Sequence, residues 1–309
     1  MTFGGSGVWP SRRVAKVAED TFWCAAHVVH QTMVCRIAPK VDGMLTTVSG
    51  ARTDVGRRRV LNEDSILDGP HMWAVADGMG GHAAGDVASR LVIESLRQLA
   101  GASHAIVRPS DIPDALNQAN ETILHHTRLN PTTAGMGSTV AGLAEVVVGG
   151  QPHWAVFNVG DSRVYRCFGG AMSRATTDHS EVEELLMAGR LTEDEARTYE
   201  ARNVITRSIG TDPAPEVDLW VLPQSPGERF LVCSDGLTSE LDDSQIAEVL
   251  LSVADPGEAA DRLMASTLEA GARDNVSIIV VDVFGDGPED LDEKTLPKIR
   301  VGEIRPEES

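Results

Sequence analysis

The stretch Asp77-Gly78-Met79-Gly80-Gly81-His82 directly follows the apolar run Met72-Trp73-Ala74-Val75-Ala76. The run predicts a buried strand, so the aspartate that ends it is expected at the edge of a sheet. The glycines after it allow a backbone or a ligand to approach closely. A single Asp-Gly after a strand is usually only a turn, so the meaning of this stretch depends on the rest of the chain.

The same arrangement recurs twice further along. The apolar residues 156–160 lead into Asp161-Ser162-Arg163, and residues 230–234 lead into Asp235-Gly236. Three apolar runs that end on an aspartate predict one acidic cluster. Carboxylate oxygens are the ligands that hard divalent cations such as Mg²⁺ and Mn²⁺ prefer. A fourth aspartate, Asp274, opens the last apolar run, and an ordinary turn residue is the alternative interpretation there.

Composition narrows the classes of protein that fit. The chain has 309 residues, 42% of them hydrophobic, and a formal net charge of −19. The charge argues against nucleic-acid binding, because the only basic patch is Arg57-Arg58-Arg59. The cysteines lack the short paired spacing of a zinc or disulfide framework, so we expect reduced thiols and a cytoplasmic protein. The sequence contains no run of about 18 apolar residues, so no membrane span is expected. The N-terminus lacks the pattern of a secretory signal.

Periodicity divides the chain into three parts. Residues 1–44 have a poor pattern, and we expect a poorly ordered N-terminal extension; a translation start at Met44 is an alternative explanation. Residues 45–284 have the strands and helices of one catalytic domain. Residues 285–309 are polar and charged, so we expect a disordered C-terminal tail.

Within residues 45–284, strands and helices come in consecutive groups. Helices are predicted over residues 85–100, 111–129, 181–188, from 192 onwards, 243–251 and 257–269. Strands are predicted over residues 45–53, 139–148, 154–159, 163–168, 217–222, 229–234 and 276–283. A hairpin is expected at Gly169-Gly170. This grouping indicates an α+β fold and not a βαβ alternation.

Other catalytic motifs are absent. The sequence contains no GxxxxGK[ST] loop and no HExxH helix, and Ser234 lacks the GxSxG frame of a nucleophile elbow. His125-His126 are adjacent on a predicted helix and cannot face one ligand, so a surface or packing role is expected. The aspartate motifs therefore carry the chemistry.

Together with residues upstream of them, these motifs resemble those of the metal-dependent protein serine/threonine phosphatases, the type 2C class, in their compact bacterial form. The motifs occur in family order: Arg59 with Asn62-Glu63-Asp64, the stretch at 77–82, Gly135-Met136-Gly137-Ser138-Thr139, Gly160-Asp161-Ser162-Arg163, Ser234-Asp235-Gly236-Leu237 and Asp274-Asn275-Val276-Ser277. The resemblance implies a four-layer α-β-β-α sandwich, in which two packed antiparallel sheets are flanked by helices and the metals lie at one edge.

The resemblance also implies metal ligands. Asp77 resembles the carboxylate that bridges two metals, and Gly78 the residue that offers its backbone carbonyl to the first. Asp235 and Asp274 resemble ligands of the second metal. Asp161, with Asp235, resembles the ligands of the weaker third metal of bacterial members.

Further roles follow from the same resemblance. Glu63 and Asp64 resemble residues that hold metal-bound waters, and Arg59 resembles the phosphate-binding arginine. Two departures stand out. Met79 occupies the position of a histidine general acid in eukaryotic members, and His82 cannot inherit that role, so no general acid is assigned. In the flap at residues 178–207, Asn203 aligns with a serine that helps to bind the third metal, which leaves third-metal binding open.

The implied function is a protein serine/threonine phosphatase. It would hydrolyse phosphoserine and phosphothreonine in proteins by attack of a water or hydroxide bridging two Mn²⁺ or Mg²⁺ ions. Arg59, Asp77 and Asp235 form the expected catalytic set. Phosphorylated proteins, Ser/Thr protein kinases among them, are the expected partners, and we expect a monomer.

Two other classes of function stay open. The first is a non-catalytic phosphoprotein-binding relative with the same fold, which the intact Asp77, Asp235 and Asp274 disfavour. The second is a two-metal nuclease or other phosphoesterase, which the acidic net charge disfavours.

Overall fold

The computed structural model describes residues 45–80, 84–101, 107–201, 203–285 and 299–300. The chain divides into two compact units, residues 1–31 and 32–309, and every described residue belongs to the second. The expectation for residues 1–44 therefore lies outside the described residues, as does His82. Among the described helices, none is both long and apolar enough to cross a membrane.

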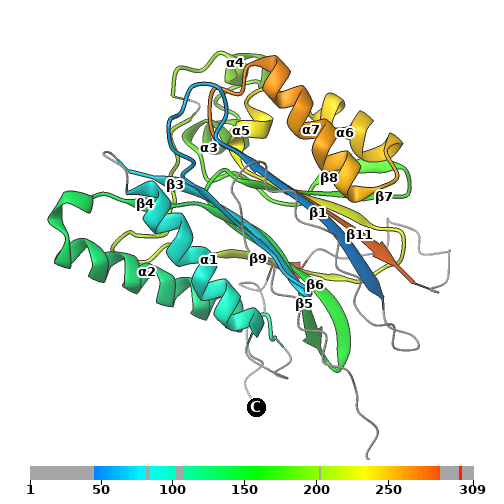
Figure 1. Cartoon of the computed structure of the whole chain (residues 1–309), viewed down its shortest axis with the longest axis horizontal. Coiled ribbons are helices and arrows are strands. Elements are labelled where there is room, and N and C mark those ends of the chain that lie inside the picture. The colour runs from blue at the N-terminus through cyan, green and yellow to red at the C-terminus, as the bar shows by residue number, and fades with distance from the viewer. Residues whose placement is uncertain (1–44, 81–83, 102–106, 202, 286–298, 301–309) are drawn as a thin grey trace, which may run out of the picture. The chain divides into compact units, whose positions relative to one another are not determined.

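Two antiparallel sheets form the centre of this unit (Figure 1). The first sheet has the strand order β1 (Thr46–Asp54), β11 (Val276–Phe284), β10 (Arg229–Cys233), β7 (Arg163–Phe168) and β8 (Ala171–Arg174). The second has the order β12 (Ile299–Arg300), β9 (Asp218–Pro223), β6 (Gln151–Val159), β5 (Val140–Val148), β3 (Met72–Met79) and β2 (Asp64–Asp68), with β4 (Gly137–Ser138) paired to β3.

The helices cover the outer faces of the two sheets. α1 (Gly85–Gly101) and α2 (Asp111–Leu129) lie against the second sheet, and the 3₁₀ turn η1 (Pro131–Thr133) follows α2. α5 (Asp235–Thr238), α6 (Asp243–Ser252) and α7 (Pro256–Ala270) lie against the first sheet. α3 (Glu181–Met187) and α4 (Glu193–Arg197) belong to the segment between β8 and β9.

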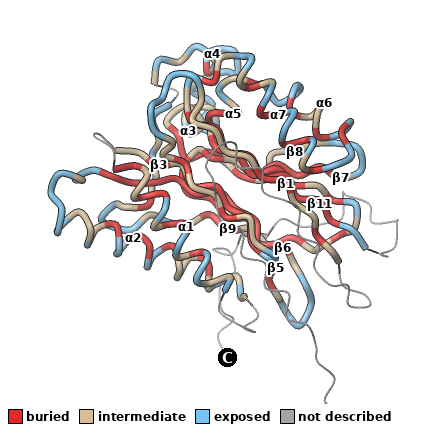
Figure 2. Tube along the Cα trace, in the orientation of Figure 1, coloured by how far each residue is buried: buried red, intermediate tan, exposed pale blue. Residues whose placement is uncertain are grey.

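Three separate apolar clusters hold these layers together. One lies between α1–α2 and the second sheet, one between the two sheets, and one between the first sheet and α5–α7. Strand β11 shows how a strand serves two of them: Ile278 and Val280 join the cluster under the helices, whereas Ile279 and Val281 join the cluster between the sheets. This alternation follows from the two-residue period of a strand, and Figure 2 shows the buried strands at the centre. The predicted four-layer sandwich is confirmed.

Most predicted elements agree with the structure. The helices predicted over 85–100, 111–129, 243–251 and 257–269 appear as α1, α2, α6 and α7, within one residue at each end. The hairpin at Gly169-Gly170 joins β7 to β8, and both glycines have positive φ, of 60° and 80°, as its tight turn requires.

Some elements differ from the sequence predictions. β6 begins at Gln151, earlier than expected, because Gln151 pairs with Val148 across another two-glycine turn. β2, β4, β8 and α5 were not predicted as separate elements. In the tail expected to be disordered, residues 299–300 form β12 and pair with Val221 and Trp220 of β9; residues 286–298 and 301–309 lie outside the described part.

Candidate metal centre

Five aspartates predicted for the site or its surroundings lie where strands of the two sheets begin or end. They are Asp64 at the start of β2, Asp77 near the end of β3, Asp161 between β6 and β7, Asp235 at the start of α5 just after β10, and Asp274 just before β11. Antiparallel neighbours bring the end of one strand beside the start of the next. Asp64 and Asp77 are directly opposite each other in the β2–β3 ladder.

The pKa values of these carboxyl groups show how close they lie. Burial raises the pKa of Asp77 well above its usual value, and negative charges raise it further, in decreasing order those of Asp64, Asp235, Asp161 and Asp274. Burial, followed by the charges of Asp235 and Asp178, raises the pKa of Asp161 to about 8. Burial raises the pKa of Asp64 to about 7 against the hydrogen bonds that lower it. The cluster is therefore a set of mutually repelling acids.

The residues present fit divalent cations. Asp64 Oδ1 and Asp235 Oδ1 are buried and have no hydrogen-bond partner, which is unfavourable for a carboxylate unless a cation or donor reaches it. Burial and the charge of Asp274 raise the pKa of Asp235, and a hydrogen bond with Asp77 opposes them. The carboxyl groups of Asp77 and Asp235 therefore lie close to each other, where a cation could neutralise both.

The described side chains do not by themselves enclose an ion. Among them, no group of three or more His, Cys, Asp or Glu is arranged closely enough to hold one. Mutual repulsion separates bare carboxylates, so an open arrangement is expected where several acids face each other without a positive charge. The unpartnered oxygens and the raised pKa values are the evidence that the cluster suits divalent cations. The role of each residue as a ligand is a proposal.

Hydroxyl groups fix the backbone of the cluster. Thr139 Oγ1 accepts a hydrogen bond from the Asp77 amide at 3.1 Å, and the Thr139 amide donates to the Asp77 carbonyl at 2.8 Å. Thr139 Oγ1 also lies 2.8 Å from Ser162 Oγ, beside Asp161. Ser234 Oγ donates to Asp64 Oδ2 at 2.8 Å. The motif residues next to the aspartates therefore hold them in place, a role the sequence did not reveal.

Two glycines allow the chain segments to approach. A Cβ at Gly78 would lie 2.0 Å from the Gly85 carbonyl oxygen, and a Cβ at Gly236 would lie 1.9 Å from the Asn275 carbonyl oxygen. Real Cβ atoms do not come so close to backbone, so α1 packs onto β3, and α5 onto the start of β11, only with glycine at these positions.

Arg59 lies at the rim of the cluster. Its Nη2 donates to Asp274 Oδ2 at 2.7 Å, and its Nη1 lies 3.8 Å from Glu63 Oε2. The hydrogen bond with Asp274 is the largest cause that raises the pKa of Arg59. The side chain is 48% exposed, so the guanidinium group has donors left for a ligand that arrives from solvent.

Asn275 braces the loop that carries Arg59. Its Nδ2 donates to the Val55 and Leu61 carbonyls, both at 3.0 Å, and its Oδ1 accepts from the Glu63 amide at 2.9 Å. One buried amide side chain therefore holds both ends of the loop against the start of β11. Sequence analysis quoted Asn275 within its motif but gave it no role; its position directly after Asp274 was the available signal.

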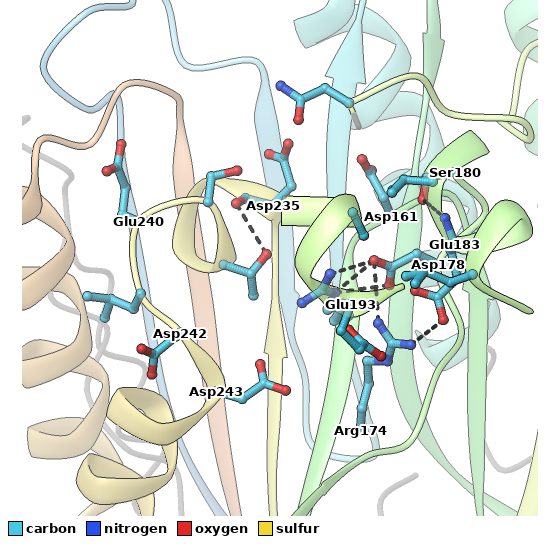
Figure 3. Close-up of a pocket in the computed structure, with 18 of the residues that line it drawn as sticks. Asp161, Arg174, Asp178, Ser180, Glu183, Glu193, Asp235, Glu240, Asp242 and Asp243 are labelled. Carbon is cyan, nitrogen blue, oxygen red and sulfur yellow. Dashed lines mark hydrogen bonds and ion pairs between the residues drawn. The ribbon is translucent and has the colours of Figure 1, made fainter. Parts of the chain in front are cut away.

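A cavity of about 770 Å³ opens beside Asp161 and Asp235, between the flap and the region of α5 and α6 (Figure 3). Asn203 lines it, so the structure brings this predicted flap residue to the same cavity as Asp161 and Asp235. Two arginines line the cavity, Arg163 and Arg174. The acidic residues that line it are more numerous: Asp161, Asp178, Glu183, Glu193, Asp235, Glu240, Asp242 and Asp243. Asp178 accepts hydrogen bonds from Arg163 and lies 3.7 Å from Arg174.

His179 connects the Asp161 loop to both ends of the flap. Its Nδ1 accepts from the Gly160 amide at 3.0 Å, and its own amide donates to the Gly160 carbonyl at 2.8 Å. The Thr206 amide donates to the His179 carbonyl at 2.7 Å. The residue is 5% exposed. Local sequence offered no signal for this role, because it depends on residues brought together by the fold.

The other predicted residues are also accounted for. Met79 is half-buried at the end of β3 and carries no proton to donate. His125 is exposed on α2, in agreement with the surface role predicted for it. The structure thus brings Arg59 and Glu63 together with the acidic cluster, and the predicted third-metal residues to its cavity side.

Comparisons with known proteins agree with this geometry. A family model described as "Protein phosphatase 2C" matches residues 57–270. The serine/threonine protein phosphatase PstP of Mycobacterium tuberculosis is 36% identical over 233 residues, which cover 75% of this chain and 44% of PstP. The serine/threonine phosphatase Stp of Listeria innocua is 32% identical over 240 residues, which cover 75% of this chain and 94% of Stp. The chain thus spans less than half of PstP and nearly all of Stp.

Solved structures give the same result. The crystal structure of the Mycobacterium tuberculosis serine/threonine phosphatase PstP/Ppp has a TM-score of 0.72 and 34% identity, and the match covers 77% of this chain and 99% of that one. The catalytic domain of PstP in complex with two manganese ions has a TM-score of 0.70 and 34% identity, over 78% of this chain and 100% of that one. The chain belongs to the protein phosphatase 2C family.

Proposed function

We propose that this chain is a metal-dependent protein serine/threonine phosphatase that hydrolyses phosphoserine and phosphothreonine in proteins. The observation that carries the proposal is a partly buried cluster of repelling carboxylates with unpartnered oxygens and a half-exposed arginine at its rim. The Listeria relative, of which the match covers 94%, is named a serine/threonine phosphatase. The related PstP catalytic domain binds two manganese ions, which supports two Mn²⁺ or Mg²⁺ ions here.

The acidic cluster would hold the cations. Asp77 and the Gly78 carbonyl, with Asp235 and Asp274, provide the oxygen ligands that such ions prefer. When bound, the cations would supply Lewis-acid activation of the attacking water and offset charge on the phosphoryl group. Asp64 is buried, accepts a hydrogen bond from Ser234 and lies opposite Asp77 in the β2–β3 ladder, which supports a role in orienting water there. Glu63 directly precedes Asp64 and is proposed to share this role.

Arg59 would bind and orient the phosphoryl group. A guanidinium group presents a planar fork of donors that matches two phosphate oxygens. Its contact with Asp274 keeps the fork at the rim, while its exposure leaves the outward donors free. Substrate would therefore approach from solvent across the loop that Asn275 braces.

No side chain is assigned as general acid. The leaving serine or threonine oxygen must gain a proton, and the thioether of Met79 has none to give. Asp161 and Asn203 are proposed to contribute to a third, weaker cation site facing the cavity.

The wider biology is proposed on the same basis. Residues 45–284 would form the catalytic domain, since each proposed ligand lies between Arg59 and Asp274; residues 1–44, and residues 285–309 apart from β12, are proposed as poorly ordered flanks. We also propose a cytoplasmic monomer whose phosphoprotein substrates include Ser/Thr protein kinases. Limited proteolysis tests the boundaries: a stable fragment that retains residues 1–44 would contradict them.

The activity is tested with a phosphothreonine peptide. Purified protein with Mn²⁺ should release phosphate, a chelator should stop the release, and renewed Mn²⁺ should restore it. Binding of the peptide without turnover would instead indicate a phosphoprotein-binding relative. Cleavage of DNA with no turnover of the peptide would indicate a nuclease.

A further inference from the structure

The loop that carries Arg59 also carries two arginines that the proposed phosphate site does not use. Arg57 and Arg58 are exposed. Within the part of the chain that the structure describes, neither guanidinium group has an ion pair or hydrogen bond. Other arginines of this chain, such as Arg52 and Arg229, pair with a carboxylate.

The backbone of this loop is fixed. The Arg57 amide donates to the Ala272 carbonyl at 2.7 Å. Gly56 has a φ of +76°, and a Cβ there would lie 2.1 Å from the Asp274 carbonyl oxygen. With the brace from Asn275 at both ends, the loop lies tightly against the segment that supplies a proposed metal ligand. The two arginines therefore keep a constant position relative to Arg59.

The position is close to the expected phosphoryl group. Successive Cα atoms are about 3.8 Å apart, so Arg57 and Arg58 lie within about 8 Å of Arg59 along the backbone. An extended peptide advances about 3.3 Å per residue. Their side chains can therefore reach groups one to three residues away from a phosphorylated residue held by Arg59.

The tip of the loop is also apolar. Val60 and Leu61 are the two residues after Arg59. Val60 is 101% exposed and Leu61 is 45% exposed. A fully exposed valine on a braced loop contributes nothing to this protein's own core. Together with Arg57 and Arg58 it forms a small surface suited to contact with another chain. We call residues 57–61 the arginine loop.

We propose that the arginine loop selects substrates in which a second anionic group lies within three residues of the phosphorylated serine or threonine. The proposal rests on the proposed phosphatase function. A carboxylate of Asp or Glu and a second phosphate share the required chemistry, because both accept hydrogen bonds from guanidinium groups. A second phosphate carries more charge, so it gains more from two arginines.

The test compares four phosphothreonine peptides of one sequence, in which the neighbouring position is neutral, aspartate, a second phosphothreonine or lysine. With saturating Mn²⁺, kcat/KM should rise about 2- to 5-fold from neutral to aspartate, as expected for one exposed charge pair. It should rise about 5- to 20-fold for the second phosphate. Both preferences should weaken between low and high salt, since exposed charges are screened.

Variants locate the effect. Arg57→Ala/Arg58→Ala should remove both preferences and leave turnover of the neutral peptide and of a small aryl phosphate unchanged. Arg57→Glu/Arg58→Glu should favour the lysine peptide. The matched control, Arg128→Ala/Arg262→Ala, removes the same charge from exposed positions on α2 and α7 and should keep the preferences.

The outcomes separate the two proposals. A gain from the carboxylate, the phosphate or both supports the inference and identifies the source of the anion. No gain from either, or a gain that survives in Arg57→Ala/Arg58→Ala, overturns it. Absence of Mn²⁺-dependent turnover on every peptide and on the aryl phosphate would instead overturn the proposed function.

Discussion

Glu228 and the acidic cluster are two solutions to the same problem, the burial of carboxylates. Glu228 is 1% exposed, and both of its oxygens have donors. Oε2 accepts from Trp154 Nε1 at 2.7 Å and from the Ser225 amide at 2.9 Å, and Oε1 accepts from Arg166 Nε at 2.8 Å. In the cluster, by contrast, Asp235 Oδ1 has no donor.

The difference separates a structural carboxylate from a functional one. At Glu228 burial raises the pKa, and Arg166 together with neutral donors from the same chain opposes the shift. At Asp77 the largest causes after burial are further negative charges, which add to the shift. The chain itself neutralises the first carboxylate, and we propose that bound cations neutralise the second group.

The strongest test of this contrast is Asp77→Asn. If Asp77 joins two cations, the variant should lose roughly a thousandfold or more in kcat. Its metal-free stability should stay equal or rise, because one repelling charge has gone. The measurements are phosphate release at saturating Mn²⁺ and urea unfolding with chelator. Near-normal turnover would remove Asp77 from the metal centre.

Glu228→Ala should have the opposite profile. It leaves Arg166 buried without its partner, which is expected to lower the free energy of unfolding by about 3–5 kcal/mol. Turnover per folded molecule should be unchanged well below the midpoint of unfolding. Glu94→Ala is the matched control, because both Arg97 and Glu94 of that pair are exposed, 53% and 49%, and a surface pair contributes about 0–1 kcal/mol. Equal losses in the two variants would contradict the contrast.

Arg59→Ala separates phosphate binding from the metal ligands. Loss of a charge-assisted contact of about 1.5–3 kcal/mol predicts a roughly 10- to 100-fold fall in kcat/KM. Calorimetric titration with Mn²⁺ should be unchanged. If Mn²⁺ affinity collapses while turnover at saturating Mn²⁺ stays normal, Arg59 serves only as a counter-ion to Asp274.

The metal-free protein should become less stable as pH rises. The folded pKa values are about 7 for Asp64 and about 8 for Asp161, against about 3.9 in an unfolded chain. At pH values between the unfolded and the folded pKa, the folded state holds protons that the unfolded state has lost. The free energy of unfolding therefore decreases with rising pH. Melting curves with chelator from pH 5 to 8.5 should show a falling Tm, which Mn²⁺ largely restores. A Tm that rises over this window would contradict the clustering.

The smallest expected effect concerns His179. In His179→Asn the amide oxygen can replace Nδ1 as acceptor for the Gly160 amide, whereas His179→Gln places its amide near Nε2. The glutamine variant should lower the affinity of the weakest Mn²⁺ site by about 10-fold. It should also speed hydrogen exchange of the Gly160 amide. The asparagine variant should stay close to the parent protein. Equal behaviour of the two would assign His179 a packing role only.

The sequence predicted the cluster because Asp77, Asp161 and Asp235 each follow an apolar run, a signal contained within a few neighbouring residues. The long helices were predictable for a similar reason, since their apolar residues recur locally. β2 was not, because only Ile66 and Leu67 are apolar in its short run, and it forms by pairing with β3.

The supporting contacts could not be predicted because they join distant segments. Asn275 and Glu63 are 212 residues apart in the sequence, and Trp154 and Glu228 are 74 apart. No local period encodes such pairs. For the same reason the sequence could not distinguish a carboxylate with partners from one without, which is the distinction that assigns function here.

The place of β11 in the first sheet has a consequence for how the protein is synthesised. β11 lies between β1 and β10 and pairs along its whole length with β1, from Thr46 opposite Phe284 to Asp54 opposite Val276. Asp274 and Asn275 arrive with it, almost at the end of the two-sheet sandwich. During synthesis from the N-terminus, the emerging chain therefore lacks both a central strand and a proposed metal ligand. We expect no dephosphorylation from nascent chains in which β11 has not yet emerged, and activity to begin only once this last large strand has paired.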